Sequence, residues 1–254
     1  MAIKLLIQIP CYNEEKTIAL VLSNLPTEIV GVSQLDVQIV NDASTDTTIE
    51  SLKDFDIKHI VNIPGPNKRY LGRAFQAGMK NALSEGYDIL VNIDADNQYP
   101  AERISDLIKP ILLNEADISI ADRSPHKIKY FSRQKRFFQK LANLIISFFC
   151  MQNVPDAVSG FRAFSKDAMK KLILKEKYTY TVESLMQAIA KGLRISWVQV
   201  EVNAATRKSK LFSNIYIKLF RSGNAALRFY LRYFFWKHCV LFIFIALLIK
   251  IIVN

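Results

Sequence analysis

The sequence predicts an α/β fold with a mostly parallel sheet flanked by helices. Up to about residue 121, short apolar runs rich in β-formers alternate with helical stretches, which is the pattern of βαβ units. Several of these runs end in acidic or amide residues, and the carboxyl ends of parallel strands form the edge at which such sheets bind ligands. The 254 residues are enough for one large domain with a small appendage.

The apolar runs and the helical stretches place the elements in order. Strands are expected at residues 4–9, 36–41, 58–62, 89–93 and 118–121. Helices are expected between them at residues 17–25, 47–53, 71–84 and 102–113. Ser44 and Asp46 precede the second helix as capping candidates, and Pro100 stands near the start of the fourth.

The chain is strongly basic, with a net charge of +11 and a pI near 9.5. This charge suggests an anionic partner, which is a nucleic acid, a membrane surface or a phosphorylated substrate. The three cysteines form no CxxC or Cys/His cluster, which argues against a zinc site or a disulfide framework. No basic region followed by a long apolar region opens the chain, so we expect no signal peptide and a cytosolic catalytic part.

The C-terminal segment is different in kind. Residues 240–253 are apolar except for Lys250, and at 1.5 Å per residue they reach about 21 Å, short of a hydrocarbon core of roughly 30 Å. Adding the aromatic residues 233–236 as an interfacial belt predicts a short spanning or half-inserted helix. The alternative is a C-terminal helix buried on the domain. The basic residues that precede the segment favour a cytosolic flank.

Two other segments combine basic, aromatic and apolar residues. Residues 127–151 would form a helix with one cationic and one apolar face, and a similar pattern recurs over residues 211–230. Such helices either lie in a membrane interface or cover the sheet. We therefore expect the α/β domain to occupy residues 1–210, followed at residues 211–254 by an amphipathic interface helix and a membrane-associated helix.

The most informative motif is Asp94-Ala95-Asp96-Asn97-Gln98, directly after the apolar run 89–93. Mg²⁺ and Mn²⁺ prefer oxygen ligands and need only one or two carboxylates besides substrate phosphates. The motif therefore predicts a site for a cation bound to a diphosphate, the alternative being a simple turn. The polar loops at 10–15 and 40–46 are expected at the same edge, and the three loops together suggest a nucleotide sugar.

Five motifs in order resemble a known family. They are Pro10-Cys11-Tyr12-Asn13-Glu14, Val40-Asn41-Asp42-Ala43-Ser44-Thr45-Asp46, Asn67-Lys68-Arg69-Tyr70-Leu71-Gly72, Asp94-Ala95-Asp96-Asn97-Gln98-Tyr99-Pro100 and Asp156-Ala157-Val158-Ser159-Gly160-Phe161-Arg162. On these motifs, over about residues 3–211, the chain resembles the family 2 inverting glycosyltransferases, and in particular the dolichol-phosphate mannosyltransferase branch of the polyprenyl-phosphate glycosyltransferases. The resemblance implies an A-type, Rossmann-like glycosyltransferase fold with C-terminal amphipathic interface helices and a short membrane segment.

The resemblance also implies roles for individual residues. Nucleotide contacts fall on Pro10, Tyr12, Glu14, Val40, Asp42, Asp94 and Ala95, and metal ligation on Asp94, Asp96 and Gln98. Contacts to the acceptor phosphate or the sugar fall on Arg123, Lys135, Arg136, Asp156 and Ser159, with Arg133 or Lys140 as substitutes for the Lys135 and Arg136 pair.

Catalytic roles are implied for four residues of the chain. They fall on Asp96, Arg207, Lys210 and Glu183. Arg207 and Lys210 would close over the diphosphate, although the spacing between them is shorter than the family usually has. Glu183 would be a sugar contact or a residual base, or else only a helix cap or ion-pair partner.

The expected reaction is metal-dependent transfer of one sugar, with inversion, from GDP-mannose or a UDP-hexose to dolichyl or polyprenyl phosphate at the cytosolic membrane face. No Gln-x-x-Arg-Trp motif is present, and a lipid monophosphate with a second pKa of about 6 needs no strong base. The expected cofactor is Mg²⁺ or Mn²⁺, and the expected partners are the nucleotide sugar, the lipid phosphate and membrane lipid. Self-association through the amphipathic helices is left open.

Two alternatives to this reaction remain. One is a membrane-associated glycosyltransferase with a hydroxyl acceptor, which makes a surface polysaccharide or a glycolipid. The other, from a different class, is a non-catalytic nucleotide-sugar sensor or a basic nucleic-acid-binding protein. The basic residues form no known nucleic-acid motif, so no nucleic-acid partner is expected.

Overall fold

The computed structural model describes residues 2–63, 70–128, 130–204 and 215–253, and its centre is a seven-stranded sheet. The strand order is β3-β2-β1-β4-β6-β5-β7. The strands are β1 (Lys4–Cys11), β2 (Gln34–Asn41), β3 (His59–Asn62), β4 (Ile89–Asn92), β5 (Ile118–Asp122), β6 (Arg162–Ser165) and β7 (Ile195–Gln199). Only β6 runs antiparallel to its neighbours β4 and β5 among the described strands, so the predicted mostly parallel sheet is confirmed.

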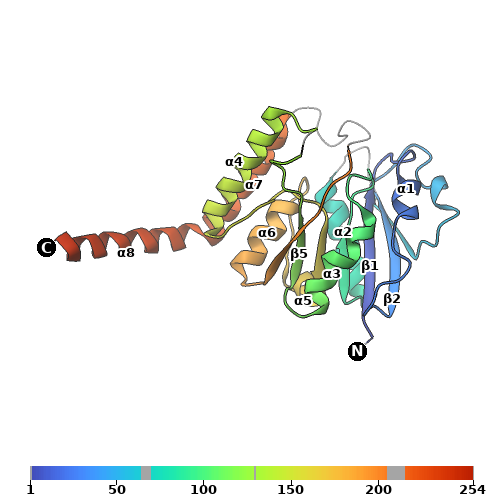
Figure 1. Cartoon of the computed structure of the whole chain (residues 1–254), viewed down its shortest axis with the longest axis horizontal. Helices are drawn as coiled ribbons and strands as arrows, with labels where there is room; N and C mark the ends of the chain where they lie inside the picture. Colours follow the sequence, from blue (N-terminus) through green and yellow to red (C-terminus); the bar gives the residue numbers. More distant parts are fainter. Residues whose placement is uncertain (1, 64–69, 129, 205–214, 254) are drawn as a thin grey trace.

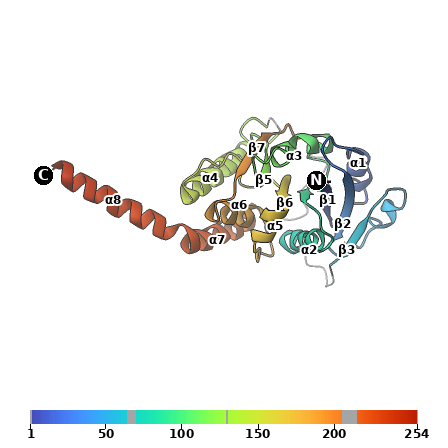
Figure 2. The same cartoon turned by 90° about the horizontal axis from the view of Figure 1, so that it is seen from below.

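Helices cover both faces of the sheet (Figures 1 and 2). They are α1 (Ile18–Ser23), α2 (Leu71–Ser84), α3 (Ile104–Leu112), α4 (Arg133–Cys150), α5 (Lys166–Lys171), α6 (Thr181–Ala190), α7 (Ile215–Tyr233) and α8 (Phe235–Val253), with short 3-10 turns η1 (Glu50–Leu52) and η2 (Ala101–Arg103). The alternation of side chains along a strand decides which helices each face receives. Leu5 and Ile7 of β1 pack with α1 and α3, while Leu6 between them packs with α2.

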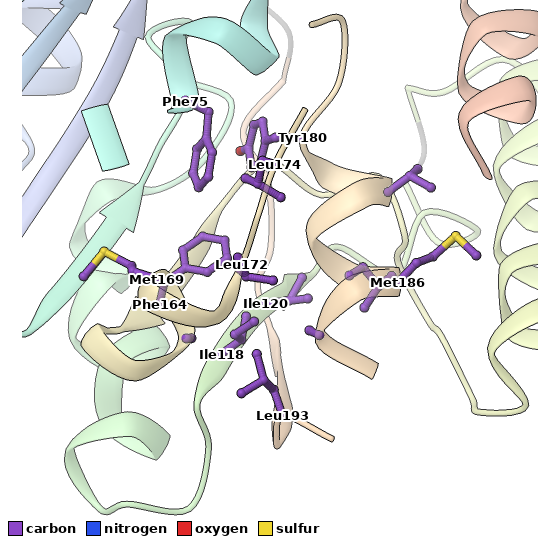
Figure 3. Close-up of a cluster of buried hydrophobic side chains, with 14 of the residues drawn as sticks. Phe75, Ile118, Ile120, Phe164, Met169, Leu172, Leu174, Tyr180, Met186 and Leu193 are labelled. Atoms are coloured by element: carbon purple, nitrogen blue, oxygen red, sulfur yellow. The ribbon is translucent and has the colours of Figure 1, made fainter. Parts of the chain in front are cut away.

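The core on the α2 and α6 side of the sheet contains a stacked aromatic pair. The rings of Phe75 from α2 and Tyr180 lie parallel, with centroids 3.9 Å apart, and Phe164 of β6 lies beside them (Figure 3). All three side chains are fully buried. Burial of large aromatic side chains dominates core energetics, so this pair fixes the start of α6 against α2.

The helix expected at residues 47–53 is wrong in length, because only the 3-10 turn η1 forms there. The side chains that would open the helix are used elsewhere: Thr48 Oγ1 accepts from the Glu14 amide at 2.7 Å and Thr47 Oγ1 donates to Glu15 Oε2 at 2.7 Å. Thr and Asp side chains that bond nearby groups compete with helix formation. Strands β6 and β7 lie beyond the region where the sequence predicted strands.

The two C-terminal helices differ in their contact with the body of the molecule. Helix α7 packs against α6 and α4, whereas α8 projects outward in both views (Figures 1 and 2). His238 at the base of α8 is buried and its Nε2 lies 3.1 Å from the Phe148 carbonyl oxygen of α4, but Trp236 and Phe242 are exposed. The alternative of a buried C-terminal helix is therefore wrong for these residues.

The described helices do not include the membrane span that the sequence predicts. None of them combines the length and the apolar composition needed to cross a bilayer.

Candidate active site

The loops that follow β1 and β2 are joined to one another. The Asn13 amide donates to Ser44 Oγ at 3.1 Å, and Asn13 Oδ1 accepts from the Thr45 amide at 2.7 Å. Tyr12 and Glu14 stand on the first loop and Asp42 begins the second. Because parallel strands end at the same edge, the two predicted nucleotide-contact loops form one continuous surface there.

Like Glu14, Asp42 is a buried carboxylate of this surface. Its amide donates to the Cys11 carbonyl at 2.9 Å, and its Oδ2 accepts from the Tyr70 amide at 2.9 Å. Burial raises the pKa of the Asp42 carboxyl above its ordinary value, against the lowering effect of the Tyr70 bond. A carboxylate kept in a disfavoured environment at a sheet edge is typical of a ligand site.

The loop after β4 carries Asp94 and Asp96. The amide and Nε2 of Gln98 donate to the two oxygens of Asp96 at 3.1 and 2.7 Å. Asn203 fixes the loop from the other side, since its amide donates to the Gln98 carbonyl at 2.9 Å and its Nδ2 to the Asn97 carbonyl at 3.0 Å. The direction of the Asp96 carboxylate is thus set by its own loop and by the chain that follows β7.

Backbone strain gathers at this edge of the sheet. Asn13, Ala43, Asn97 and Ser124 have φ values of 55°, 57°, 57° and 45°, and they follow β1, β2, β4 and β5 in turn. A residue other than glycine in this region costs roughly 1–3 kcal/mol, and such residues cluster at functional sites. Four loops with a strained residue lie at this one edge of the sheet, which makes the edge the candidate functional site.

Arg123, in the loop after β5, is paired with Asp156. Arg123 Nε and Nη2 donate to the two carboxylate oxygens at 2.6 and 2.8 Å, and the Asp156 side chain is fully buried. Burial acts to lower the pKa of Arg123, but the Asp156 carboxylate outweighs it and raises that pKa. The pair leaves out the Nη1 group, so Arg123 keeps donors beyond those that Asp156 takes.

Ser159 and Gly160 connect this pair to the Asp94 loop. Tyr99 Oη accepts from the Gly160 amide at 2.9 Å and lies 3.4 Å from Ser159 Oγ. Below them, Asn92 Nδ2 donates to the Gly160 carbonyl at 3.0 Å and to Tyr180 Oη at 2.8 Å. Ser159 and Gly160 therefore lie against Tyr99 and Asp94, while their predicted contacts to the acceptor or the sugar stay predictions.

Three other predicted residues make contacts outside this network: Lys135, Arg136 and Glu183. Lys135 and Arg136 stand in the first turn of α4, with Lys135 Nζ 3.4 Å from the Phe131 ring centroid and Arg136 Nη1 3.4 Å from the Ile128 carbonyl. Glu183 is 1% exposed and accepts the amides of Lys175 and Glu176. Arg207 and Lys210, and residues 67–69 of the third motif, fall outside the described residues.

A comparison with known protein families identifies the family of this chain. Residues 6–173 match the model of glycosyl transferase family 2. The chain belongs to this family. It is 30% identical over 216 residues to the UDP-N-acetylglucosamine–dolichyl-phosphate N-acetylglucosaminyltransferase of Methanococcus voltae, covering 76% of this chain and 83% of the relative. It is 26% identical over 238 residues to the polyprenol monophosphomannose synthase of Mycolicibacterium smegmatis, covering 88% and 87%.

The fold of this family 2 glycosyltransferase has solved counterparts. The glucosyl-3-phosphoglycerate synthase of Mycobacterium tuberculosis, solved with Mn²⁺, UDP and glucosyl-3-phosphoglycerate, superposes with a TM-score of 0.68 at 20% identity. The match covers 91% of this chain and 80% of that one. The likeness confirms the predicted A-type glycosyltransferase fold.

The acidic loop of this glycosyltransferase fits a hard divalent cation bound with phosphates. Asp94 and Asp96 supply carboxylate oxygens, and a Cβ at position 160 would lie 3.0 Å from Asp94 Oδ2, a tight contact. Within the ranges that the structure describes, no group of three or more His, Cys, Asp or Glu forms a complete cage. Mg²⁺ and Mn²⁺ sites that are completed by substrate phosphates need only one or two carboxylates.

Three residues that support the site were not predicted from the sequence. Asn92, Tyr180 and Asn203 hold Gly160 and the acidic loop through side-chain hydrogen bonds. Asn92 does leave a signal, because an amide inside the apolar run 89–93 needs a buried partner. Asn203 leaves none, since its role depends on two chain segments meeting.

Proposed function

We propose that this glycosyltransferase transfers one sugar, with inversion, from a nucleotide sugar to a polyprenyl or dolichyl phosphate. The observation that carries the proposal is the meeting of three parts at one sheet edge: the Asp42 surface, the Asp94 and Asp96 loop, and the Arg123–Asp156 pair. The first suits a nucleoside, the second a metal-bound diphosphate, and the third an anionic acceptor.

The lipid phosphate acceptor is supported by the relatives. Of the two named above, one is by its name a dolichyl-phosphate N-acetylglucosaminyltransferase and the other a synthase of polyprenol monophosphomannose. Arg123 suits such an acceptor because guanidinium groups bind phosphate oxygens in a fixed fork. Its position is fixed by the buried Asp156, so little side-chain entropy is lost when an anion binds.

The geometry of Glu183 supports a reaction without a protein base. Both of its oxygens accept backbone amides at 2.8 Å, and the side chain is buried. A phosphate monoester is largely dianionic at neutral pH, because its second pKa is about 6, and it can attack the sugar without losing a proton. The residues of the site would then act by orienting donor and acceptor.

A divalent cation is part of the proposal. Asp94, Asp96 and Gln98 would hold Mg²⁺ or Mn²⁺, which when bound would neutralise charge on the leaving diphosphate. The chain's own contribution is to aim the Asp96 carboxylate through the two Gln98 bonds and to fix the loop backbone through the Asn203 bond. Arg207 and Lys210 stay predicted contacts of the same diphosphate.

We also propose that the cytosolic membrane surface is the place of reaction. Helix α4 exposes a row of apolar side chains beside its basic ones, and α8 exposes another: Phe137, Leu141, Leu144, Ile145 and Phe148 on α4, and Trp236, Val240, Phe242, Ile243 and Phe244 on α8. Apolar and basic faces on one helix are typical of interfacial binding. Residues 211–254 would then serve as the membrane-contacting appendage of the catalytic domain.

A donor screen tests the proposed function. The full chain in detergent with Mn²⁺ or Mg²⁺ is given GDP-mannose, UDP-glucose or UDP-N-acetylglucosamine, with and without polyprenyl phosphate, and the released nucleotide is measured. We expect release that needs both the lipid phosphate and Asp96, and that Asp96→Ala abolishes. Release that is indifferent to the lipid phosphate would instead support a hydroxyl acceptor, and no release with any donor would leave a binding role.

A further inference from the structure

We infer that Glu183 is a positioning residue, which sets the nucleotide surface around Asp42 through the connection between α5 and α6. This α5–α6 connection consists of residues 172–180. The inference rests on the proposed function, because it assigns Asp42 to the donor nucleotide. It assigns to Glu183 no proton transfer and no contact with the sugar.

The first step is the set of hydrogen bonds from α6 that hold the α5–α6 connection in place. Glu183 Oε1 accepts the Lys175 amide and Oε2 the Glu176 amide, both at 2.8 Å. One turn later, Gln187 accepts the Ile173 amide at 3.0 Å and donates to the Ile173 carbonyl at 2.7 Å. Two side chains on one helix face thus make four bonds to a backbone that has no strand partner in the sheet.

Two buried leucines also hold this stretch of backbone in place. Leu172 and Leu174 are 4% and 9% exposed, and they point into the cluster that contains Phe164 and Tyr180 (Figure 3). Leu172 and Leu174 are buried, and the amides of residues 173, 175 and 176 are bonded to α6. The backbone of residues 172–176 is therefore held in one position. A connection without regular structure is rarely fixed this firmly, since loops are commonly the mobile parts of a fold.

The second step passes from the connection to α2. The Gly72 amide donates to the Lys177 carbonyl at 2.9 Å, and Gln76 Nε2 donates to the Glu176 carbonyl at 3.0 Å. Contact is so close that a Cβ on residue 72 would lie 2.1 Å from the Glu176 oxygen. Only glycine allows this approach, so the start of α2 is placed by the backbone that Glu183 holds.

The third step reaches the nucleotide surface. Tyr178 packs edge-on against Tyr70, with ring centroids 5.1 Å apart and planes at 78°. The Tyr70 amide donates to Asp42 Oδ2 at 2.9 Å. Tyr70 directly precedes α2, so the contact on Tyr70 acts on the residue whose amide orients the Asp42 carboxylate, and the contact on Gly72 fixes the helix start beside it.

A single substitution separates positioning from proton transfer. In Glu183→Gln one carboxylate oxygen becomes an NH₂ group that faces a backbone N–H, so one of the two amide bonds is lost. If Glu183 positions the nucleotide surface, nucleotide binding weakens even when no acceptor is present. If Glu183 is a base, only the rate of transfer falls.

The experiment measures binding of UDP and GDP to the full chain by calorimetry with Mn²⁺, at a temperature well below the melting temperature of every variant. Three variants are compared with wild type. Glu183→Gln removes a bond from α6 to the connection, Gly72→Ala disturbs the close contact between the connection and α2, and Tyr178→Leu removes the ring contact with Tyr70. Asp36→Asn is the matched control, because Asp36 accepts from Tyr87 and Gln34 on β2 away from the connection.

We expect the Kd of the nucleotide that binds wild type to rise in all three variants by about three- to thirtyfold, the range over which remote residues alter an affinity. Asp36→Asn should lower the melting temperature and leave that Kd unchanged. The inference would be overturned if all three variants bound the nucleotide with wild-type affinity. The clearest such result would be that Glu183→Gln alone also lost sugar transfer. If wild type bound neither UDP nor GDP, the proposed function would fall first, and the inference with it.

Discussion

Gly160 lies directly against the Asp94 carboxylate. A Cβ built on residue 160 would lie 3.0 Å from Asp94 Oδ2 and 3.2 Å from Oδ1, closer than ordinary van der Waals contact. The carbonyl of Gly160 is held in turn by Asn92 and Tyr180. The absence of a side chain at this position therefore decides where the first carboxylate of the acidic loop can point.

Gly160→Ala should displace the Asp94 carboxylate and leave the fold intact. We expect affinity for Mn²⁺, measured with bound nucleotide by calorimetry or electron paramagnetic resonance, to fall by about ten- to a hundredfold, as when supporting contacts of a metal site are lost.

Gly223→Ala is the control for that substitution. Its Cβ meets nothing within 4 Å, and alanine is favoured over glycine inside a helix such as α7. Equal Mn²⁺ affinity in Gly160→Ala and wild type would show that Asp94 has room to move without loss.

Removing one partner of the Arg123–Asp156 pair should destabilise the protein strongly. Asp156 has no exposed side-chain surface, and a buried charge left without its partner costs about 3 to 5 kcal/mol. Arg123→Ala should therefore lower the free energy of unfolding by that amount in a urea titration.

The double variant Arg123→Met with Asp156→Leu separates stability from function. Replacing a buried ion pair by apolar residues of similar volume is often neutral or stabilising, so most of the lost stability should return. Transfer to the lipid phosphate should stay lost, because the guanidinium group is gone. A stable double variant with wild-type transfer would limit Arg123 to a structural role.

The sheet and the acidic loops were predictable because their signals are local. The run 89–93 followed by two aspartates identifies a strand and the loop after it without any knowledge of the rest of the chain. The supporting contacts were not predictable for the opposite reason. The two amide bonds to Glu183 depend on α6 packing against a connection whose sequence has no periodic pattern. From the sequence alone, Glu183 could equally be a base, a helix cap or an ion-pair partner.

The length of the helix at residues 47–53 was wrong for a related reason. The sequence pattern predicted a helix here, but Thr47 and Thr48 bond the loop after β1, more than 30 positions earlier in the chain. Side chains used by the site were thus unavailable to cap or continue a helix.

Asp42→Asn should stabilise the fold at neutral pH. Burial raises the pKa of Asp42 above its ordinary value of 3.8, so the folded state holds this proton more tightly than the unfolded state does. The free energy of unfolding of wild type therefore falls as the pH rises from the ordinary to the raised pKa. Above that window the ionised carboxylate is a cost that asparagine lacks, while the asparagine oxygen can still accept from the Tyr70 amide.

The melting temperature measured against pH tests this expectation. The advantage of Asp42→Asn should be larger at pH 7 than at acidic pH and should vanish well below pH 3.8, where the wild-type carboxyl is protonated in both states. Nucleotide affinity should fall in the same variant, as expected where stability is given up for function. An equal melting temperature at pH 7 would show that the carboxylate is not disfavoured in the fold.

The apolar row on α4 should be required for membrane binding. Leu144 is 65% exposed in the middle of this row, and a carboxylate there would have to enter the interface at a cost of several kcal/mol. We expect Leu144→Glu to reduce flotation of the full chain with vesicles of phosphatidylcholine and phosphatidylglycerol, and to reduce transfer to polyprenyl phosphate in those vesicles.

Val30→Glu is the matched control for the apolar row. Val30 is 95% exposed and follows α1, which lies at the end of the molecule remote from α4 (Figure 1). The same charge is added there, so a general effect of charge repulsion from anionic lipid would appear in both variants. Loss confined to Leu144→Glu would identify α4 as the contact, because only a local apolar surface distinguishes the two positions. Equal flotation of both variants and wild type would instead leave α8 as the element that reaches the lipid.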